Sequence, residues 1–273
     1  MTILTGIHGN ETTGLLVLHE LLRDLPQVSG TLQIIMAANP LAVIEQKRAS
    51  FVDQLDVNRI FPGDIHGTMT QRIAAKLIDF LKQSGLVIDL HSFEMDTPVM
   101  GIMVNSSLND KNKELMEIFS PRQVWVIQPN HEVEQQFGKS LSAVLNEHGI
   151  PNFALETTRA ERIPIEEITT CVEGLKRVIS FFMTITHPTN RAKIPFFSRT
   201  KVSAPESGIF TPHARLSQHV KKGEMLGTIT LLPECKDCIV HAPHDGVVMQ
   251  LMQHKFVLLG EEIAAIGTAW KRE

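Results

Sequence analysis

The sequence TILTGIHGNE, from Thr2 to Glu11, joins a short apolar run to two side chains that can bind a metal ion. Thr2–Thr5 has the apolar character of a buried strand. The leucines after it recur at helical spacing and predict a helix. They are Leu15, Leu16, Leu18, Leu21, Leu22 and Leu25. His8 and Glu11 are therefore expected on a strand-to-helix turn, and open α/β sheets bind ligands at such turns, at the carboxyl ends of strands.

A third candidate ligand lies about eighty residues further along the chain. His91 follows a second apolar strand, Leu86–Leu90. Catalytic zinc takes three protein ligands, often two histidines and a glutamate, and keeps a fourth position for a water that it makes acidic. His8-x-x-Glu11 alone is a weak signal, because 12 histidines and 30 acidic residues produce such spacings by chance. The two strand-end positions together predict a zinc site and hydrolysis. Asp89 is expected either to orient a ligand or to bond to local backbone.

Strand-like and helix-like segments alternate as far as residue 183. The further strands are expected at residues 32–37, 99–104, 124–127 and 153–155, and the further helices at 69–82, 138–147 and 164–185. Repeated alternation of this kind is typical of an α/β domain with a largely parallel or mixed sheet.

The pattern changes after about residue 186, where the breaker cluster His187–Asn190 is followed by no convincing helical stripe. Ala204–Phe210 reappears 38 residues later as Ala242–Val248, and the Gly-Glu pair at residue 223 is echoed at 260. Two matching halves predict a small β-sandwich or barrel, and they resemble biotinyl/lipoyl carrier domains. Lys236 lies between the halves, where carrier domains have their modified lysine, but its Cys-Lys-Asp-Cys setting differs from theirs.

Composition excludes several classes of protein. The net charge is −4 and Lys/Arg runs are missing, so neither a nucleic-acid nor an anionic-membrane surface is expected. No apolar stretch approaches the length of a membrane span, and no signal peptide is recognised, so the expected location is the cytoplasm. Three cysteines cannot form a disulfide framework, and the lone CxxC of Cys235 and Cys238 is weak evidence for a metal or redox site.

Several segments, taken jointly, are specific. These are Gly6–Glu11, Asn39-Pro40, Asp56–Gly63 (DVNRIFPG), Asp89–His91 and Glu156. In order and spacing they resemble the succinylglutamate desuccinylase/aspartoacylase family, relatives of the zinc carboxypeptidases. The resemblance implies a zinc carboxypeptidase-like α/β domain at residues 1–186, with a mixed sheet flanked by helices. It also implies a smaller all-β, barrel-sandwich (lipoyl-like) domain at residues 187–273 that caps the active site.

The resemblance also implies a role for each candidate residue. His8, Glu11 and His91 bind one zinc ion per chain, Glu156 is the general base, Asn58 and Arg59 hold a substrate carboxylate, and Arg48 polarises the scissile carbonyl. Arginine suits a carboxylate because its planar fork donates two parallel hydrogen bonds. The assignment of Arg48 has an alternative, because the interval to Arg59 is longer than in aspartoacylases and Lys47 could be the inward residue.

The activity implied is hydrolysis of the amide bond of a small N-acyl amino acid, a reaction of amino acid metabolism. One alternative is a metallocarboxypeptidase or peptidoglycan-type amidase that acts on short peptides. The chain has no tyrosine, which counts against both peptidase action and strict aspartoacylase specificity. Another alternative is a non-catalytic binding or carrier protein. The acyl group and the amino acid stay open, as does a homo-oligomer that would cover an exposed sheet edge.

Overall fold

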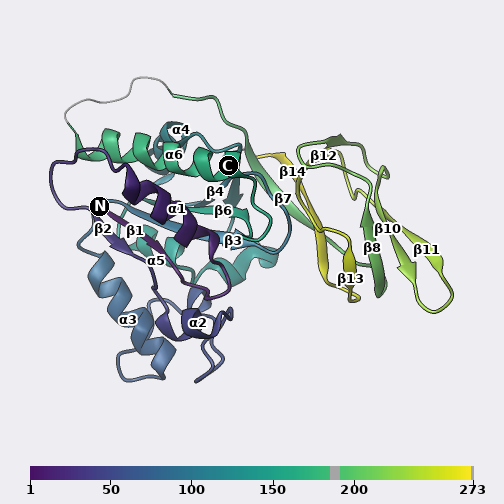
Figure 1. Cartoon of the computed structure of the whole chain (residues 1–273), viewed down its shortest axis with the longest axis horizontal. Coiled ribbons are helices and arrows are strands. Elements are labelled where there is room, and N and C mark those ends of the chain that lie inside the picture. Colours follow the sequence, from purple (N-terminus) through teal and green to yellow (C-terminus); the bar gives the residue numbers. More distant parts are fainter. Residues whose placement is uncertain (185–190, 272–273) are drawn as a thin grey trace.

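The chain folds around one large mixed sheet with helices on both faces. The computed structural model describes residues 1–184 and 191–271, so the expected domain boundary at 186/187 and the breaker cluster 187–190 lie outside the described residues. Ten strands form the large sheet in the order β2-β1-β3-β6-β4-β5-β7-β14-β12-β9 (Figure 1). Four more form a second sheet in the order β11-β10-β8-β13. The expected α/β class with a mixed sheet is confirmed.

The first part of the chain alternates strands with helices. Its strands are β1 (Thr2–Thr5), β2 (Gln33–Ile35), β3 (Val87–Phe93), β4 (Met100–Val104), β5 (Gln123–Ile127) and β6 (Asn152–Thr158). Its α-helices are α1 (Thr13–Arg23), α2 (Pro40–Glu45), α3 (Met69–Leu81), α4 (Asn109–Phe119), α5 (Leu141–Glu147) and α6 (Ile165–Met183). Two 3₁₀ helices, η1 (Val57–Arg59) and η2 (Glu132–Phe137), lie between them.

The two faces of the large sheet are covered by different helices. Along β3, Ile88 and Leu90 pack in a core with α1, α4 and α6, whereas Val87 packs in another core with α3 and α5. In Figure 1, α4 and α6 lie along the upper side of the molecule and α2 and α3 at the lower side. Because side chains alternate along a strand, Asp89 and His91 point to the side of α3 and α5.

Local sequence explains where several elements begin. Asn39 caps α2 by accepting a hydrogen bond from the backbone N–H of Ala42, and Pro40 occupies the first turn, where its missing N–H is not needed. Thr68 and Gln71 form a capping box at the start of α3. The Asn39-Pro40 motif is thus a helix start.

Every element described after residue 191 is a strand. These strands are β7 (Phe196–Ser203), β8 (Gly208–Pro212), β9 (His219–Val220), β10 (Met225–Leu231), β11 (Lys236–His241), β12 (Gly246–Leu251), β13 (Lys255–Val257) and β14 (Glu262–Ala269). The sequence repeat corresponds to equivalent strands, since β8 matches β12 and β10 matches β14. The first of each pair lies in the small sheet and the second in the large one. They enclose a separate apolar core that includes Phe210, Ile229, Val248 and Ile266.

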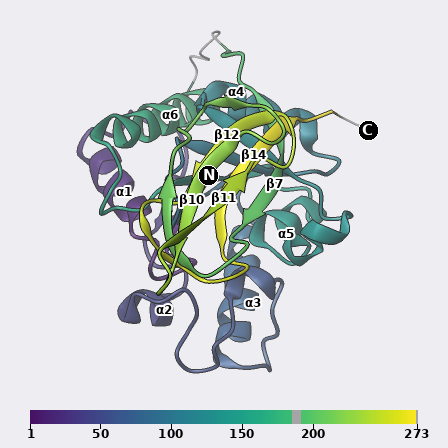
Figure 2. The ribbon, with the colours of Figure 1, turned by 90° about the vertical axis from the view of Figure 1, so that its right-hand side faces the viewer.

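Strands β7 to β14, residues 196–269, are called the β-region, and strand β7 joins it to the rest of the molecule. It runs parallel to β5, with Trp125 opposite Phe197, and antiparallel to β14. In Figure 2 the β-region faces the viewer, with β10, β11, β12 and β14 in front. None of the helices in the described ranges is long and apolar enough to cross a lipid bilayer.

Candidate active site

The turn between β1 and α1 carries His8 and Glu11, as expected. It is held against the segment that follows α2 by the backbone N–H of Gly9, which donates to the carbonyl of Lys47 at 2.8 Å. A Cβ atom on Gly9 would lie 1.8 Å from the carbonyl oxygen of Ala42, so only glycine permits this close approach. The turn therefore has a defined position above the sheet.

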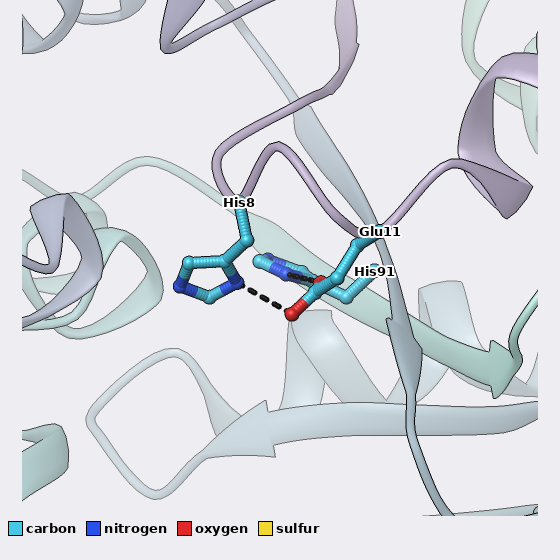
Figure 3. A group of neighbouring side chains, drawn as sticks. All are labelled: His8, Glu11 and His91. Atoms are coloured by element: carbon cyan, nitrogen blue, oxygen red, sulfur yellow. Dashed lines mark hydrogen bonds and ion pairs between the residues drawn. The ribbon is translucent and has the colours of Figure 1, made fainter. Parts of the chain in front are cut away.

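The structure brings His8, Glu11 and His91 together, and all three are buried (Figure 3). Glu11 lies between the imidazoles, with Oε1 2.7 Å from Nδ1 of His8 and Oε2 2.8 Å from Nδ1 of His91. One ligand atom from each residue lies within 4.8 Å of the others. This convergence arises because β1 and β3 are neighbouring parallel strands, whose carboxyl ends lie at the same edge of the sheet.

Two further carboxylates hold the far nitrogens of the imidazoles. Nε2 of His8 is 3.0 Å from Oδ1 of Asp56, and Nε2 of His91 is 2.6 Å from Oδ2 of Asp89. Carboxylates placed in this way fix the ring and keep the proton on Nε2, which leaves the Nδ1 lone pairs free for a metal ion. Asp89 therefore contacts a candidate ligand, one of the two roles expected of it. Asp56 was quoted as part of a motif, but no such role was expected of it.

The charge of the site matches a divalent cation. Burial alone would raise the pKa of Glu11, but the imidazoles of His8 and His91 hold that pKa well below its usual range. Burial would likewise lower the pKa of His91, yet the carboxylates of Asp89 and Glu11 raise it well above its usual value. Two histidines and a glutamate with a supporting carboxylate behind each imidazole form a donor set that suits zinc.

Asp89→Asn is expected to lower the affinity for zinc about 10- to 100-fold, because the amide is uncharged and supports the imidazole of His91 less strongly. Competition between the protein and a chelating dye measures this affinity. Asp79→Asn is the matched control, since Asp79 is 77% exposed and pairs with Lys82 on the surface. Equal zinc affinity in the two variants would contradict a supporting role for Asp89.

Glu156 lies on β6 directly beside the candidate metal-binding group. Its register partner in the parallel β3·β6 pair is His91. Burial is the main reason that the pKa of the Glu156 carboxyl rises to about 8, opposed by His91 and Arg48 and assisted by Glu11 and Asp89. Its Oε2 atom is buried and has no hydrogen-bond partner among the described residues. The carboxyl group thus has an oxygen free to exchange a proton inside the cavity.

Arg48 points inward and Lys47 points away. Nε and Nη2 of Arg48 lie 3.1 and 2.9 Å from Oδ2 of Asp56, and Nη1 lies 3.2 Å from Oε1 of Glu11. Lys47 instead pairs with Glu45 at 3.1 Å and is exposed. The Arg48 side chain is 48% exposed, which places it at the rim of the candidate metal site.

Asn58 and Arg59 line the same cavity from η1, directly after Asp56. The side-chain oxygen of Asn58 accepts a hydrogen bond from the backbone N–H of Leu141 at 2.8 Å, so a contact of Asn58 with a ligand must come from its amide nitrogen. Arg59 donates to the carbonyl of Asn58 at 2.8 Å, and its guanidinium lies 4.6 Å from the centre of the Phe137 ring. The remaining donors of the fork suit a carboxylate.

These side chains line one cavity of about 450 Å³. Three residues of the β-region, Arg199, Lys201 and Glu262, also line it, and the sequence analysis did not find them. Arg199 and Lys201 are two residues apart on β7 and therefore point to the same face of the strand. This spacing of two basic residues was visible in the sequence. Arg199 pairs with Glu262 and donates to Oε1 of Gln250 at 2.6 Å, so its charge is already neutralised.

Comparison with known proteins finds similarity in sequence. Residues 1–182 match the family described as the succinylglutamate desuccinylase/aspartoacylase catalytic domain. An N-alpha-acetyl-L-2,4-diaminobutyric acid deacetylase from Halomonas elongata is 31% identical over 112 residues, which are 40% of this chain and 33% of that protein. The match thus spans about a third of that relative's length.

Solved structures share the fold over nearly the whole chain. A succinylglutamate desuccinylase/aspartoacylase from Rhodobacter sphaeroides is 23% identical, with a TM-score of 0.83 over 99% of this chain and 86% of that one. The product-bound ectoine utilization protein EutE (DoeB) from Ruegeria pomeroyi is 21% identical, with a TM-score of 0.83 over 97% and 84% of the two chains.

Proposed function

Because this chain belongs to the succinylglutamate desuccinylase/aspartoacylase family, we propose that it hydrolyses the amide bond of a small N-acyl amino acid with one bound zinc ion. One observation supports this activity above all others. Two imidazoles and a carboxylate with a common centre lie beside Glu156, which has a buried free oxygen and a raised pKa. A Lewis acid next to a proton acceptor is the arrangement that hydrolysis by an activated water requires.

In this proposal His8, Glu11 and His91 hold the ion through the Nδ1 atoms and the carboxylate, while Asp56 and Asp89 keep the imidazoles in place. A zinc ion so held supplies Lewis acidity, which makes a hydrolytic water acidic enough to react near neutral pH. Neither histidine is then needed for proton transfer, because in each imidazole Nδ1 would bind the ion and Nε2 contacts a carboxylate.

Glu156 carries the proton. Its carboxylate takes a proton from the attacking water as the oxygen bonds to the amide carbon, and it delivers that proton to the amine nitrogen as the carbon–nitrogen bond breaks. The products are a carboxylic acid and a free amino acid, and Glu156 returns to its starting state. A pKa near neutrality suits a group that must accept and then donate a proton.

Arg48 and the pair Asn58 and Arg59 act on different parts of the substrate. Arg48, at the rim of the candidate metal site, donates to the carbonyl oxygen as negative charge develops there, the contribution that usually lowers the barrier most. Arg59 and the amide nitrogen of Asn58 bind the carboxylate of the amino acid. The substrate amide is thereby placed beside Glu156.

The division of the chain into two units is also a proposal. Residues 1–186 would form a zinc carboxypeptidase-like catalytic domain, and residues 187–273 a barrel-sandwich domain, lipoyl-like in its repeat, that caps the active site. The separate core of the β-region supports this division. Capping is supported by Arg199, Lys201 and Glu262, which line the cavity from the β-region. A cavity of about 450 Å³ bounded in this way favours a small substrate over a peptide chain.

The proposal is tested by assaying the purified full chain with N-acetyl and N-succinyl amino acids, with short peptides as a comparison, and by measuring zinc in the same sample. We expect one zinc ion per chain and release of free amino acid from the N-acyl compounds, with little release from the peptides. Faster hydrolysis of peptides would identify a carboxypeptidase-type enzyme instead. Absence of both stoichiometric metal and hydrolysis would support a binding or carrier protein.

A further inference from the structure

From the wall of the cavity next to Arg59, we infer that this enzyme acts on N-acyl derivatives of apolar amino acids, with the amino acid side chain packed against that wall. This inference rests on the proposed function and specifies its substrate class. An acidic side chain, as in aspartate or glutamate, does not suit the same surface.

The wall consists of side chains from three neighbouring strands. They are Ile102 and Val104 of β4, Trp125 and Ile127 of β5, and Ala154 of β6. Ile102 lies opposite both Trp125 and Ala154 in the sheet register, and Val104 lies opposite Ile127. The five side chains therefore form a continuous apolar surface on one face of the sheet.

This surface begins directly beside the groups that would hold the amino acid. Ala154 precedes Glu156 by two residues and shares its face of β6. Phe137 connects the wall to Arg59, because its ring lies 4.6 Å from the Arg59 guanidinium carbon and 5.4 Å from the Trp125 ring. When Arg59 binds the carboxylate and Glu156 lies at the amine nitrogen, the side chain on the intervening carbon is directed to this wall.

The charged groups closest to the wall already have partners. Glu134 accepts from the indole N–H of Trp125 at 3.1 Å and from the backbone N–H of Gln128 at 2.6 Å. Arg199 covers the Trp125 ring at 4.7 Å, but it is paired with Glu262 and its side chain is only 7% exposed. Lys201 also lines the cavity, but it is exposed and lies four residues along β7 from Phe197, the register partner of Trp125, so it is not one of the groups next to the wall. A charged substrate side chain on the wall would thus lose water without gaining a partner, which is costly.

The first test varies the amino acid while the acyl group stays acetyl. For the zinc-loaded protein we expect kcat/KM for N-acetyl-L-leucine and N-acetyl-L-phenylalanine to exceed that for N-acetylglycine, N-acetyl-L-aspartate and N-acetyl-L-lysine by about tenfold or more. A preference for aspartate or lysine would overturn the inference and leave the proposed function intact. No hydrolysis of any N-acyl amino acid would overturn the proposed function itself.

The second test asks which part of the substrate contacts the wall. Val104→Thr adds a hydroxyl at nearly constant volume and is expected to lower kcat/KM for N-acetyl-L-leucine about tenfold, with little change for N-acetylglycine. Val126→Thr is the matched control, because Val126 lies on β5 but packs in the core on the opposite face of the sheet. An equal loss for both substrates in Val104→Thr, or the same selective loss in Val126→Thr, would contradict the inference.

A third measurement does not depend on turnover. Calorimetry with the Glu156→Gln protein is expected to show tighter binding of L-leucine than of L-aspartate, and Val104→Thr in that background should remove the difference.

Dependence of hydrolysis on acyl-chain length in an N-acylglycine series, without dependence on the amino acid side chain, would assign the wall to the acyl group and overturn the inference.

Discussion

Glu156→Gln is expected to lower kcat about a thousandfold while the protein keeps its zinc. The amide of glutamine has the shape of the carboxyl group but cannot take a proton from water at neutral pH. Glu156 faces His91 in the sheet without a hydrogen bond to the three candidate ligands, so the substitution leaves their contacts in place. The measurements are steady-state hydrolysis of an N-acyl amino acid and zinc content on the same sample.

Glu94→Gln provides the control for this substitution. Glu94 also lines the cavity, but its carboxylate is 56% exposed and pairs with Lys255 at 3.0 Å. We expect the control to retain most of the activity, because Glu94 has no proton to transfer in the proposed reaction. Near-normal turnover in Glu156→Gln would show that another group accepts the proton.

Loss of a candidate ligand is expected to have the larger effect. His91→Ala leaves one imidazole and one carboxylate, and it leaves Asp89 buried without its partner. Zinc affinity should fall by more than the 10- to 100-fold expected for a supporting carboxylate, and activity at ordinary zinc concentrations should fall by about 10⁴-fold or more. Metal analysis after dialysis and rate measurements across a range of zinc concentrations test both effects.

Two controls separate metal loss from unfolding. His148→Ala removes an exposed imidazole at the end of α5 and should leave zinc and activity unchanged. Treatment of the unaltered protein with a chelator should abolish activity, and added zinc should restore it. If His91→Ala stayed folded with a full zinc content, His91 would not be a ligand.

Several elements of the fold were predictable because their signals are local. The apolar Thr2–Thr5 and the helical stripe of residues 69–82 correspond closely to β1 and α3. The stripe of leucines in α1 was predictive of a helix but not of its buried face, since Leu16 and Leu22 are 42% and 45% exposed. Of that set, Leu18 and Leu21 are buried in the eleven-residue helix, together with Val17, which the set did not include.

Other elements were missed because their local signal is weak. Helix α4, Asn109–Phe119, begins with polar residues and has its buried apolar side chains towards its end. Its helical form depends on packing against α6 and β4. Helix α2 has only six residues, and its Asn39-Pro40 start was visible in the sequence as a motif rather than as a helix.

The sequence alone placed His8, Glu11 and His91 near the carboxyl ends of two predicted strands, and the pairing of those strands brings the three together. Each belongs to a turn or strand with a clear local pattern, and parallel neighbouring strands present their carboxyl ends at one edge. The roles of Glu156, Arg48, Asn58 and Arg59 stay predictions, although all four line the same cavity.

Only the tertiary structure decided that Asp56 holds His8, that β7 brings Arg199 to the cavity, and that β4, β5 and β6 form an apolar wall beside Arg59. The physical reason is that these contacts depend on sheet register and strand order. Both are set by the packing of segments far apart in the chain. The periodicity within any one segment carries no information about that packing.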